Sequence, residues 1–382
     1  MKRLRTGILA GILAGIIATP GLVKAKEEKL ITTEGTITTV FQQIIKNEGN
    51  FTPTSGLSSA GDFAFSFTPT EKDEIFLNLS VASGNAVNNH SPFNLSPYAD
   101  DLEDDLSPIN GRKHRNNVLE FWYSHEFSLM EDAKLKITAG IIDATCYIDD
   151  NEYANDETSQ FMQDPFVNNP IANLPSYDYG GVVEFEKGNV NAKLLYMHPK
   201  DGDNNIYYDY FALQLGYKVD FSFGEGNYRI YAFTTSKDFP EPNSTEKASL
   251  KGIGVSFDQE VIKDTLGVFF RAGWQDDKAQ TVNYKNCFSF GISAPLKKYF
   301  KYGDTLGMGI SYLKGAHNVD STKTFEIYST KTFETYIKFN LGSYKNQISS
   351  DLTLDFQYMQ DKYTGGAENA GYFYGVRWNV SF

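Results

Sequence analysis

This chain of 382 residues carries a formal charge of −13, which excludes nucleic-acid binding through a phosphate-neutralising surface. Aromatic residues make up 15% of it, with 24 Tyr and 29 Phe, yet the mean hydropathy is negative at −0.38. Only two cysteines are present, which excludes a disulfide-dense secreted scaffold. High aromatic content with negative hydropathy is expected of strands with one apolar and one polar face. Composition therefore favours a membrane barrel over a soluble exported protein.

The first residues are typical of a secretory signal peptide. Three cations within the first five residues precede an apolar run from Gly7 to Val23, and Ala25 closes a Val-Lys-Ala box. A membrane anchor is the alternative, but the run is only about 17 residues long and contains Pro20, and a spanning helix needs ~20. We predict cleavage near Ala25, with residues 26–382 as one barrel domain. Its charge is −17, because the leader carries four Lys and Arg residues.

Apolar and polar residues alternate with a period of two in segments spread along the chain. In the last segment Tyr372, Trp378 and Phe382 share one parity, and Arg377 and Asn379 share the other. The two parities lie on opposite faces of a strand. Most such segments are close to the ~9–11 residues of a tilted spanning strand. Sixteen are predicted, at residues 36–45, 60–68, 74–83, 117–127, 133–142, 177–187, 190–198, 207–221, 226–236, 247–259, 263–275, 281–295, 303–313, 331–341, 347–359 and 370–382.

Long and short connections between the predicted strands alternate along the chain. Connections after even-numbered segments are mostly short turns, such as residues 70–73 and 187–189. Long loops on one side and tight turns on the other are typical of outer-membrane barrels, and sixteen strands leave room for an aqueous lumen that the polar parity must face. We therefore predict an all-β transmembrane antiparallel β-barrel of about sixteen strands. The long connections, after odd-numbered segments, are residues 84–116, 143–176, 199–206, 237–246, 314–330 and 360–369.

Residues 143–176 are the most unusual connection. They have neither helical nor strand periodicity, and acidic, amide and hydroxyl side chains crowd them. Loops of this length are usually functional or disordered, and disordered tracts avoid the aromatic residues that this loop contains, such as Phe161 and Phe166. We predict that the loop is ordered, folds into the barrel and narrows the pore as a constriction loop.

Three of the five arginines outside the leader lie within predicted strands on the polar parity. A guanidinium presents a planar fork of donors to vicinal hydroxyls or carboxylates, and an aromatic ring such as that of Trp122 can stack on the apolar face of a solute. The alternative is that these side chains only line the lumen and pair for stability. The predicted pore-lining and substrate-binding residues are Arg271, Arg377, Arg229, Glu120, Trp122, Glu334, Asp355, Asp149, Asn155, Glu157 and Gln160.

Several blocks of the sequence carry a resemblance to a known family. Residues 141–161 and 166–170 look like the signature loop of the carbohydrate-selective porins, the OprB family, and Gly267–Trp274 resembles that family's Gly-Val-Phe-x-Arg-x-Gly strand. Residues 304–307 and 355–358 also match family blocks, so the resemblance covers most of the chain from about residue 115. It implies a porin of sixteen strands that passes neutral sugars by diffusion, and it supports Arg271, the segment from Asn155 to Gln160 and, more weakly, Arg377.

The resulting functional prediction is an outer-membrane porin for passive, selective diffusion of small carbohydrates. Its expected partners are neutral monosaccharide-type solutes, outer-membrane lipid and lipopolysaccharide, with a homo-oligomer possible in principle and no cofactor, metal or nucleic acid. A general, non-selective diffusion porin is one alternative. An outer-membrane hydrolase is the other, but none of the five His residues comes with a recognisable nucleophile or metal-ligand spacing.

Two further patterns leave alternatives open. The acidic run from Tyr98 to Asp105 could bind a divalent cation that bridges lipopolysaccharide, but it lacks the spacing of a calcium loop, and a solvated acidic loop is favoured. Cys146 begins the predicted constriction loop, and Cys287 lies on the polar parity of its strand. Export permits a disulfide between them, which would attach the loop to the wall.

Overall fold

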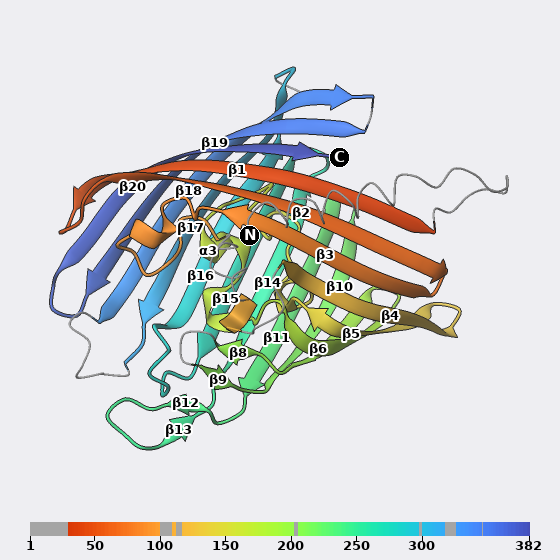
Figure 1. Ribbon diagram of the computed structural model, residues 1–382, viewed down its shortest axis with the longest axis horizontal. Coiled ribbons are helices and arrows are strands. Elements are labelled where there is room, and N and C mark those ends of the chain that lie inside the picture. Colours follow the sequence, from red (N-terminus) through yellow and green to blue (C-terminus); the bar gives the residue numbers. More distant parts are fainter. Residues whose placement is uncertain are drawn as a thin grey trace, which may run out of the picture.

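Sixteen antiparallel strands close into a barrel in the computed structural model, which describes residues 30–99, 109–111, 117–201, 205–297, 300–317, 326–345 and 347–382 (Figure 1). Each strand pairs with the next in the order of the chain, and the first pairs with the last, so the barrel sheet has no free edge. The predicted leader and residues 100–105 of the acidic run lie outside the described residues. The barrel strands are β1 (Ile31–Glu48), β2 (Thr54–Thr70), β3 (Asp73–Ser83), β4 (Val118–Met130), β5 (Ala133–Ile142), β6 (Asp178–Lys187), β7 (Val190–Met197), β10 (Tyr210–Phe221), β11 (Gly224–Thr235), β14 (Lys251–Ile262), β15 (Leu266–Gln275), β16 (Tyr284–Pro295), β17 (Gly303–Gly315), β18 (Ile327–Tyr344), β19 (Ile348–Tyr363) and β20 (Glu368–Ser381).

Each of the sixteen predicted segments overlaps one barrel strand, and the fold class is confirmed. The boundaries differ where loops carry strands of their own. Residues Lys247–Ala248 form β13, which pairs with β12 (Phe239–Pro240) in a separate ribbon, so the predicted strand at 247–259 begins later. A second ribbon joins β8 (Lys200–Asp201) to β9 (Ile206–Tyr207).

The predicted loop at residues 360–369 is only a turn. β19 and β20 stay paired as far as Lys362 and Glu368, because their alternating ladder continues beyond the segments that the hydrophobic pattern marks. Strand pairing does not need apolar side chains on both faces, so the ladder extends past the apolar band. The short turns at the other end of the barrel are where the sequence predicts them.

The two faces of the wall differ as the alternation predicts. From Tyr210 to Gly216 in β10 every second residue is buried: Gln214 is 0% exposed, while its neighbour Leu213 is 46% exposed. The outward parity carries the large exposed apolar and aromatic side chains, such as Phe121 and Trp378. An apolar outer band around a polar interior is the arrangement that a lipid environment requires of a barrel.

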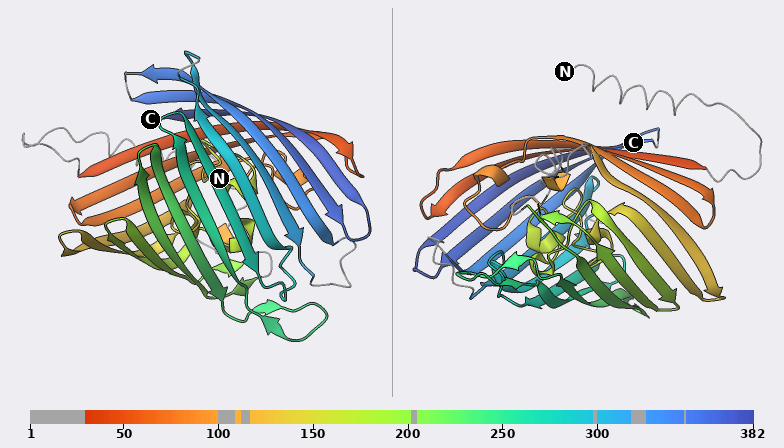
Figure 2. Two further views of the ribbon diagram at one scale, coloured as in Figure 1. Left: turned by 180° about the vertical axis from the view of Figure 1, so that it is seen from behind. Right: turned by 60° about the horizontal axis from the view of Figure 1, so that its bottom comes forward.

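The helical elements are short. They are η1 (Asn88–His90), η2 (Ile109–Gly111), η3 (Ala144–Cys146), α3 (Asp164–Val167) and η4 (Pro170–Ala172). Within the described part of the chain, no helix is both long enough and apolar enough to cross a membrane. The last three belong to the connection between β5 and β6. Figure 1 and the right-hand view of Figure 2 show this yellow-green segment inside the ring of strands.

Candidate functional site

The connection between β5 and β6 has a shape that its own polar residues support. The Asp143 carboxylate accepts from the backbone N–H of Thr145 at 2.9 Å and caps η3. Pro165 lies in the first turn of α3, where backbone N–H groups have no partner within the helix, so the N–H that proline lacks costs no hydrogen bond. Asn169 caps η4 through the backbone N–H of Ile171 at 3.4 Å. Two capped turns and one short helix with proline in its first turn give an ordered loop without regular periodicity.

Arg271, on β15, is the central anchor of this loop. Its Nε lies 2.9 Å from Oδ2 of Asp149, and both side chains are 0% exposed. Its two terminal nitrogens donate to the carbonyl oxygens of Phe166 and Asp149, each at 2.9 Å, and to Oδ1 of Asn155 at 3.1 Å. Burial raises the pKa of Asp149 to about 6, although the Arg271 cation acts in the opposite direction. One guanidinium thus bonds three separate points of the loop.

A second arginine anchors the same turn of the loop from the neighbouring part of the wall. Arg229, on β11, lies 3.1 Å from Asp150 and 2.6 Å from Asp258 on β14. Lys193 on β7 approaches Asp150 at 3.5 Å, and Gln214 on β10 donates to it at 2.7 Å. Burial alone would raise the pKa of Asp150, but the two cations hold it below its usual range.

Arg377, on β20, holds the part of the loop farthest from its ends. Its terminal nitrogens donate to the carbonyl oxygens of Glu157 at 2.6 Å and Gln160 at 3.0 Å, and to the Thr353 hydroxyl at 3.2 Å. The neighbouring inner residue of the strand, Asn379, donates to the carbonyl oxygen of Thr158 at 2.6 Å. The side chain of Arg377 is fully buried under these contacts.

The buried carboxylate of Glu334, on β18, holds the loop by accepting hydrogen bonds from its backbone, whereas the arginines donate to it. It accepts the backbone N–H groups of Met162 and Gln163 at 2.6 and 2.9 Å. Beside this contact the ring of Phe161 packs between Phe269 and Tyr336, with centroids 5.4 and 5.0 Å away. Polar and apolar contacts therefore fix the same turn.

Glycines in the wall make room for these loop side chains. A Cβ at Gly309 would lie 2.8 Å from the ring of Phe166, and a Cβ at Gly375 would lie 2.9 Å from the methyl group of Met162. Both are closer than real Cβ atoms approach a neighbour. The close approach of loop to wall depends on the absence of a side chain at these positions.

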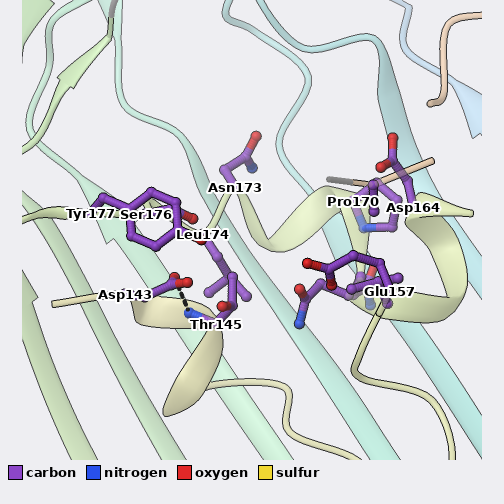
Figure 3. A pocket seen from close by; sticks show the side chains of 13 residues that line it. Asp143, Thr145, Glu157, Asp164, Pro170, Asn173, Leu174, Ser176 and Tyr177 are labelled. Atoms are coloured by element: carbon purple, nitrogen blue, oxygen red, sulfur yellow. Dashed lines mark hydrogen bonds between the residues drawn. The ribbon is translucent and has the colours of Figure 1, made fainter. Parts of the chain in front are cut away.

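A cavity of about 350 Å³ lies along the loop (Figure 3). Asp143, Glu157, Asp164, Asn168 and Asn173 supply much of its polar lining. All the lining residues belong to the described part of the chain, and none is Lys or Arg. Burial raises the pKa of Asp143. Carboxylate and amide oxygens of this kind accept hydrogen bonds from hydroxyl groups and disfavour anions.

The preceding long connection closes against the same loop. Backbone N–H of Ser96 donates to Asp164 at 2.8 Å, and backbone N–H of Ala99 donates to the carbonyl oxygen of Met162 at 2.8 Å. Ala99 is also part of the cavity lining. The sequence does not predict this second contact, because nothing in the composition of the segment distinguishes a lumen-facing loop from an exterior one.

The sequence-predicted residues divide into two groups in space. Glu120, which is buried, and Trp122, which is half-buried, lie on the inner parity of β4 beside the start of the loop, where Glu120 interacts with Asp143 and Trp122 packs against a cluster that includes Ala144. In the other group, Arg271 and Arg377 bond the loop and present no exposed surface, so the prediction that they face solute is wrong. The residues gathered around the loop are Arg229, Arg271, Arg377, Glu334, Asp355, Asp149, Asn155, Glu157 and Gln160.

Two predictions concerned alternatives that involve cysteine or metal. Cys146 and Cys287 are both free thiols, so the disulfide that could have attached the loop to the wall is not formed. The contacts of the loop with the wall arginines and with Glu334 hold it to the wall without a disulfide. Among the described residues, no group of three or more His, Cys, Asp and Glu side chains is arranged to hold a metal ion.

The chain is similar to known proteins in sequence and in fold. A family profile described as "Carbohydrate-selective porin, OprB family" matches residues 101–382. An uncharacterized protein of Aquifex aeolicus is 32% identical over 295 residues, which cover 76% of this chain and 79% of the relative. OprB of Pseudomonas putida superposes with a TM-score of 0.71 at 12% identity, covering 92% of this chain and 94% of that one. The outer-membrane protein OmpT of Vibrio cholerae superposes with a TM-score of 0.53 at 12% identity, covering 94% and 100%.

Proposed function

This chain belongs to the carbohydrate-selective porin family OprB, and from that premise we propose that it passes small neutral sugars by passive diffusion through a lumen narrowed by residues 143–176. It is an outer-membrane selective porin, and the family consists of channels, so a hydrolase is not supported. The proposal concerns the solute and the residues that select it.

The observation that carries the proposal is the anchoring of the loop inside the barrel. Sixteen strands alone enclose an aqueous hole that would discriminate poorly. Buried contacts from Arg271, Arg377 and Glu334 fix the loop across part of this hole. The cavity beside the loop offers acceptors to hydroxyl groups. A neutral polyhydroxyl solute can thus replace part of its hydration shell as it passes.

Transport of this kind uses neither a cofactor nor energy coupling. The solute moves down its concentration gradient, and the contacts must be weak enough to release it, because conduction needs exit as well as entry. Hydroxyl-to-carboxylate and hydroxyl-to-amide bonds exchanged for similar bonds to water give a small net free energy, which suits this requirement. Charged solutes lose more on leaving water, so they are disfavoured.

Liposome swelling with the purified full-length protein tests the proposal. Glucose should enter much faster than anionic or zwitterionic solutes of equal size. Equal entry rates for all of these solutes would instead identify a general diffusion porin. The exposed hairpin ion pair between Lys218 and Glu225 supplies a control, because Lys218→Met removes a charge on the turn side and should leave the ratio of rates unchanged.

Outside the lumen, we propose contacts with lipid and lipopolysaccharide along the apolar outer band and cleavage of the leader near Ala25. The intact mass of protein purified from outer membranes checks the cleavage site. A homo-oligomer is the further possibility, and native mass spectrometry in detergent distinguishes it from a monomer.

A further inference from the structure

A row of charges with alternating sign crosses the inner face of four neighbouring strands, β4 to β7 (Figure 1). Glu126 on β4 is the direct cross-strand partner of Lys136 on β5. Lys136 is in turn the partner of Glu184 on β6, and Glu184 is the partner of Lys193 on β7. Leu194, the neighbour of Lys193, is 55% exposed on the outer face, so Lys193 points inward. We call these four charged residues the charge row.

The charge row remains partly open to the lumen. The side chains of Glu126 and Lys136 are 32% and 39% exposed, and that of Lys193 is 14% exposed. Glu184 is half-buried. Each of the four lies three or four residues from the turn-side end of its strand. The row therefore faces water in the half of the lumen nearer the turns.

The two ends of the charge row meet the constriction loop and a cavity. Lys193 lies 3.5 Å from Asp150 of the loop, and its partner Gln214 on β10 donates to the same carboxylate at 2.7 Å. At the other end, Glu126 and Lys136 line a cavity of about 800 Å³ on the turn side of the barrel. A solute that leaves the loop toward the turn side has this wall beside it.

The charges of the row are paired with one another, but in partly exposed positions. Glu184 interacts with both lysines of the row. Glu126 accepts from Lys134, whose Nζ lies 3.0 Å away, and Lys134 stands opposite Glu186, so the alternation repeats one step nearer the turns. Exposed ion pairs contribute only about 0–1 kcal/mol each, because water competes for both partners. A hydroxyl group can compete in the same way.

Alternating charges suit a solute whose groups both donate and accept. An ammonium group donates and a carboxylate accepts, while a hydroxyl does both, so one hydroxyl can bond a lysine and the neighbouring glutamate together. Adjacent strands are about 4.8 Å apart, which puts further charges within reach of the other hydroxyls of one sugar ring. An ion of either sign instead meets a like charge on every second strand.

We propose that the charge row is a second selecting surface of the lumen, which favours a neutral sugar over charged sugars of either sign. This inference rests on the proposed function, because it assumes that sugars enter the lumen. It adds to the cavity beside the loop, whose carboxylates disfavour anions but not cations. Each contact is exchanged for a similar contact with water, so the sugar is held weakly enough to leave.

Exchanging two charges of the row tests whether their order matters. Lys136→Glu with Glu184→Lys keeps the net charge but places two acids beside two bases. Liposome swelling compares glucose with glucuronate and with protonated glucosamine, which share its pyranose ring. The wild type should admit glucose faster than either ion. The exchange should lower both ratios about fivefold, the factor given by about 1 kcal/mol between unit charges about 4 Å apart in water.

A single reversal gives a signed prediction. Glu184→Lys creates three consecutive lysines, so entry of glucuronate relative to glucose should rise about fivefold and entry of glucosamine should fall. Glu225→Lys is the matched control, because it makes the same change of charge in the exposed β10–β11 hairpin, outside the row. It should leave both ratios unchanged. Glu184→Gln keeps the shape of the side chain and should give a smaller shift in the same direction.

The outcomes separate the charge row from the proposed function. Wild-type preference for glucose, with unchanged ratios in the exchange and in both variants of Glu184, would overturn the row and leave the proposed function intact. Equal shifts in Glu184→Lys and Glu225→Lys would also overturn the row, because net charge alone would then explain them. Equal entry of all three sugars into wild-type liposomes would remove the proposed function itself.

Discussion

The inner face of the barrel contains two regions that look alike in sequence but differ in structure. On the side of β15 to β20, the polar parity carries Arg271, Arg377 and Glu334, all buried beneath the loop. On the side of β3 to β5, the same parity carries Trp122 and Lys136, which remain partly open. The alternation places both sets inward, and the loop decides which of them reach the solute.

This difference shows that a side chain that points into the barrel does not necessarily contact the solute. A buried guanidinium whose terminal nitrogens already donate to loop carbonyl oxygens is a structural element. The half-buried indole of Trp122, by contrast, stacks on Phe76 and keeps part of its surface exposed. We propose that the selective surface of the lumen comprises loop residues that face away from the wall and wall residues that the loop leaves uncovered.

Removing the central anchor should have the largest effect. Arg271→Met leaves the Asp149 carboxylate buried without its partner, at a cost of about 3–5 kcal/mol. The loop should detach while the barrel ladder persists, so single-channel conductance should rise and disaccharides should enter as readily as monosaccharides. The double variant Asp149→Asn with Arg271→Met removes both charges and should recover part of the loss. Wild-type conductance in Arg271→Met would contradict the assignment of this anchor.

Arg377→Met should have a smaller effect of the same kind. Its hydrogen bonds go to two carbonyl oxygens and one hydroxyl, and the buried carboxyl group of Asp355 lies near enough to interact with its charge. The expected loss is about 3 kcal/mol, which loosens the segment around Glu157 without releasing Asp149. Bilayer recordings should show a noisier open channel with a modest rise in mean current. A rise as large as that of Arg271→Met would show that the two anchors act as one unit.

The wall glycines offer a matched pair of substitutions. Gly309→Ala places a methyl group against the rigid ring of Phe166, whereas Gly375→Ala meets the flexible end of Met162. We expect a cost of about 1–3 kcal/mol for the first and less for the second, since a methionine side chain can shift. Limited proteolysis of the loop should be faster in Gly309→Ala. The reverse order would show that loop and wall are packed differently.

The smallest effect concerns pH. Burial raises the pKa of Asp149 to about 6 from 3.8, so the folded loop binds the proton more tightly than the unfolded loop. Proton binding by Asp149 therefore stabilises the folded loop, and this contribution is fully present below about pH 4 and is lost as the pH rises through about 6. Open-channel noise should increase over this window in the wild type and stay flatter in Asp149→Asn. Identical pH profiles in the two proteins would assign the effect to other groups.

Period-two alternation predicted every barrel strand and the sign of each face, because that pattern depends on lipid outside and water inside. The alternation could not predict which lumen-facing residues the loop covers. The useful signal was the presence of Phe269 and Tyr336 on the polar parity. Aromatic residues that face a water-filled lumen need a partner, and Phe161 of the loop supplies it. Gly309 and Gly375 on the same parity mark the same contact.

Composition identified the loop, but it did not show whether the polar side chains of the loop bond to solute or to the protein itself. Its carboxylates and amides were expected to face solute opposite the arginines. Several instead cap turns or pair with the wall, as Asp143 does with Thr145 and Asp149 with Arg271. A side chain with two oxygens can serve the backbone or a ligand equally well, and only its three-dimensional neighbours distinguish the two.

Hydrogen exchange at the amides of residues 149–169 tests the central claim most directly. The N–H groups of Met162 and Gln163 donate to Glu334, and that of Asn169 donates to Asp149, all in buried positions. These amides should exchange as slowly as those of the barrel strands and should be released by Arg271→Met. Exchange in the wild type as fast as in the exposed turn at residues 364–366 would mean that the loop is not held in the lumen.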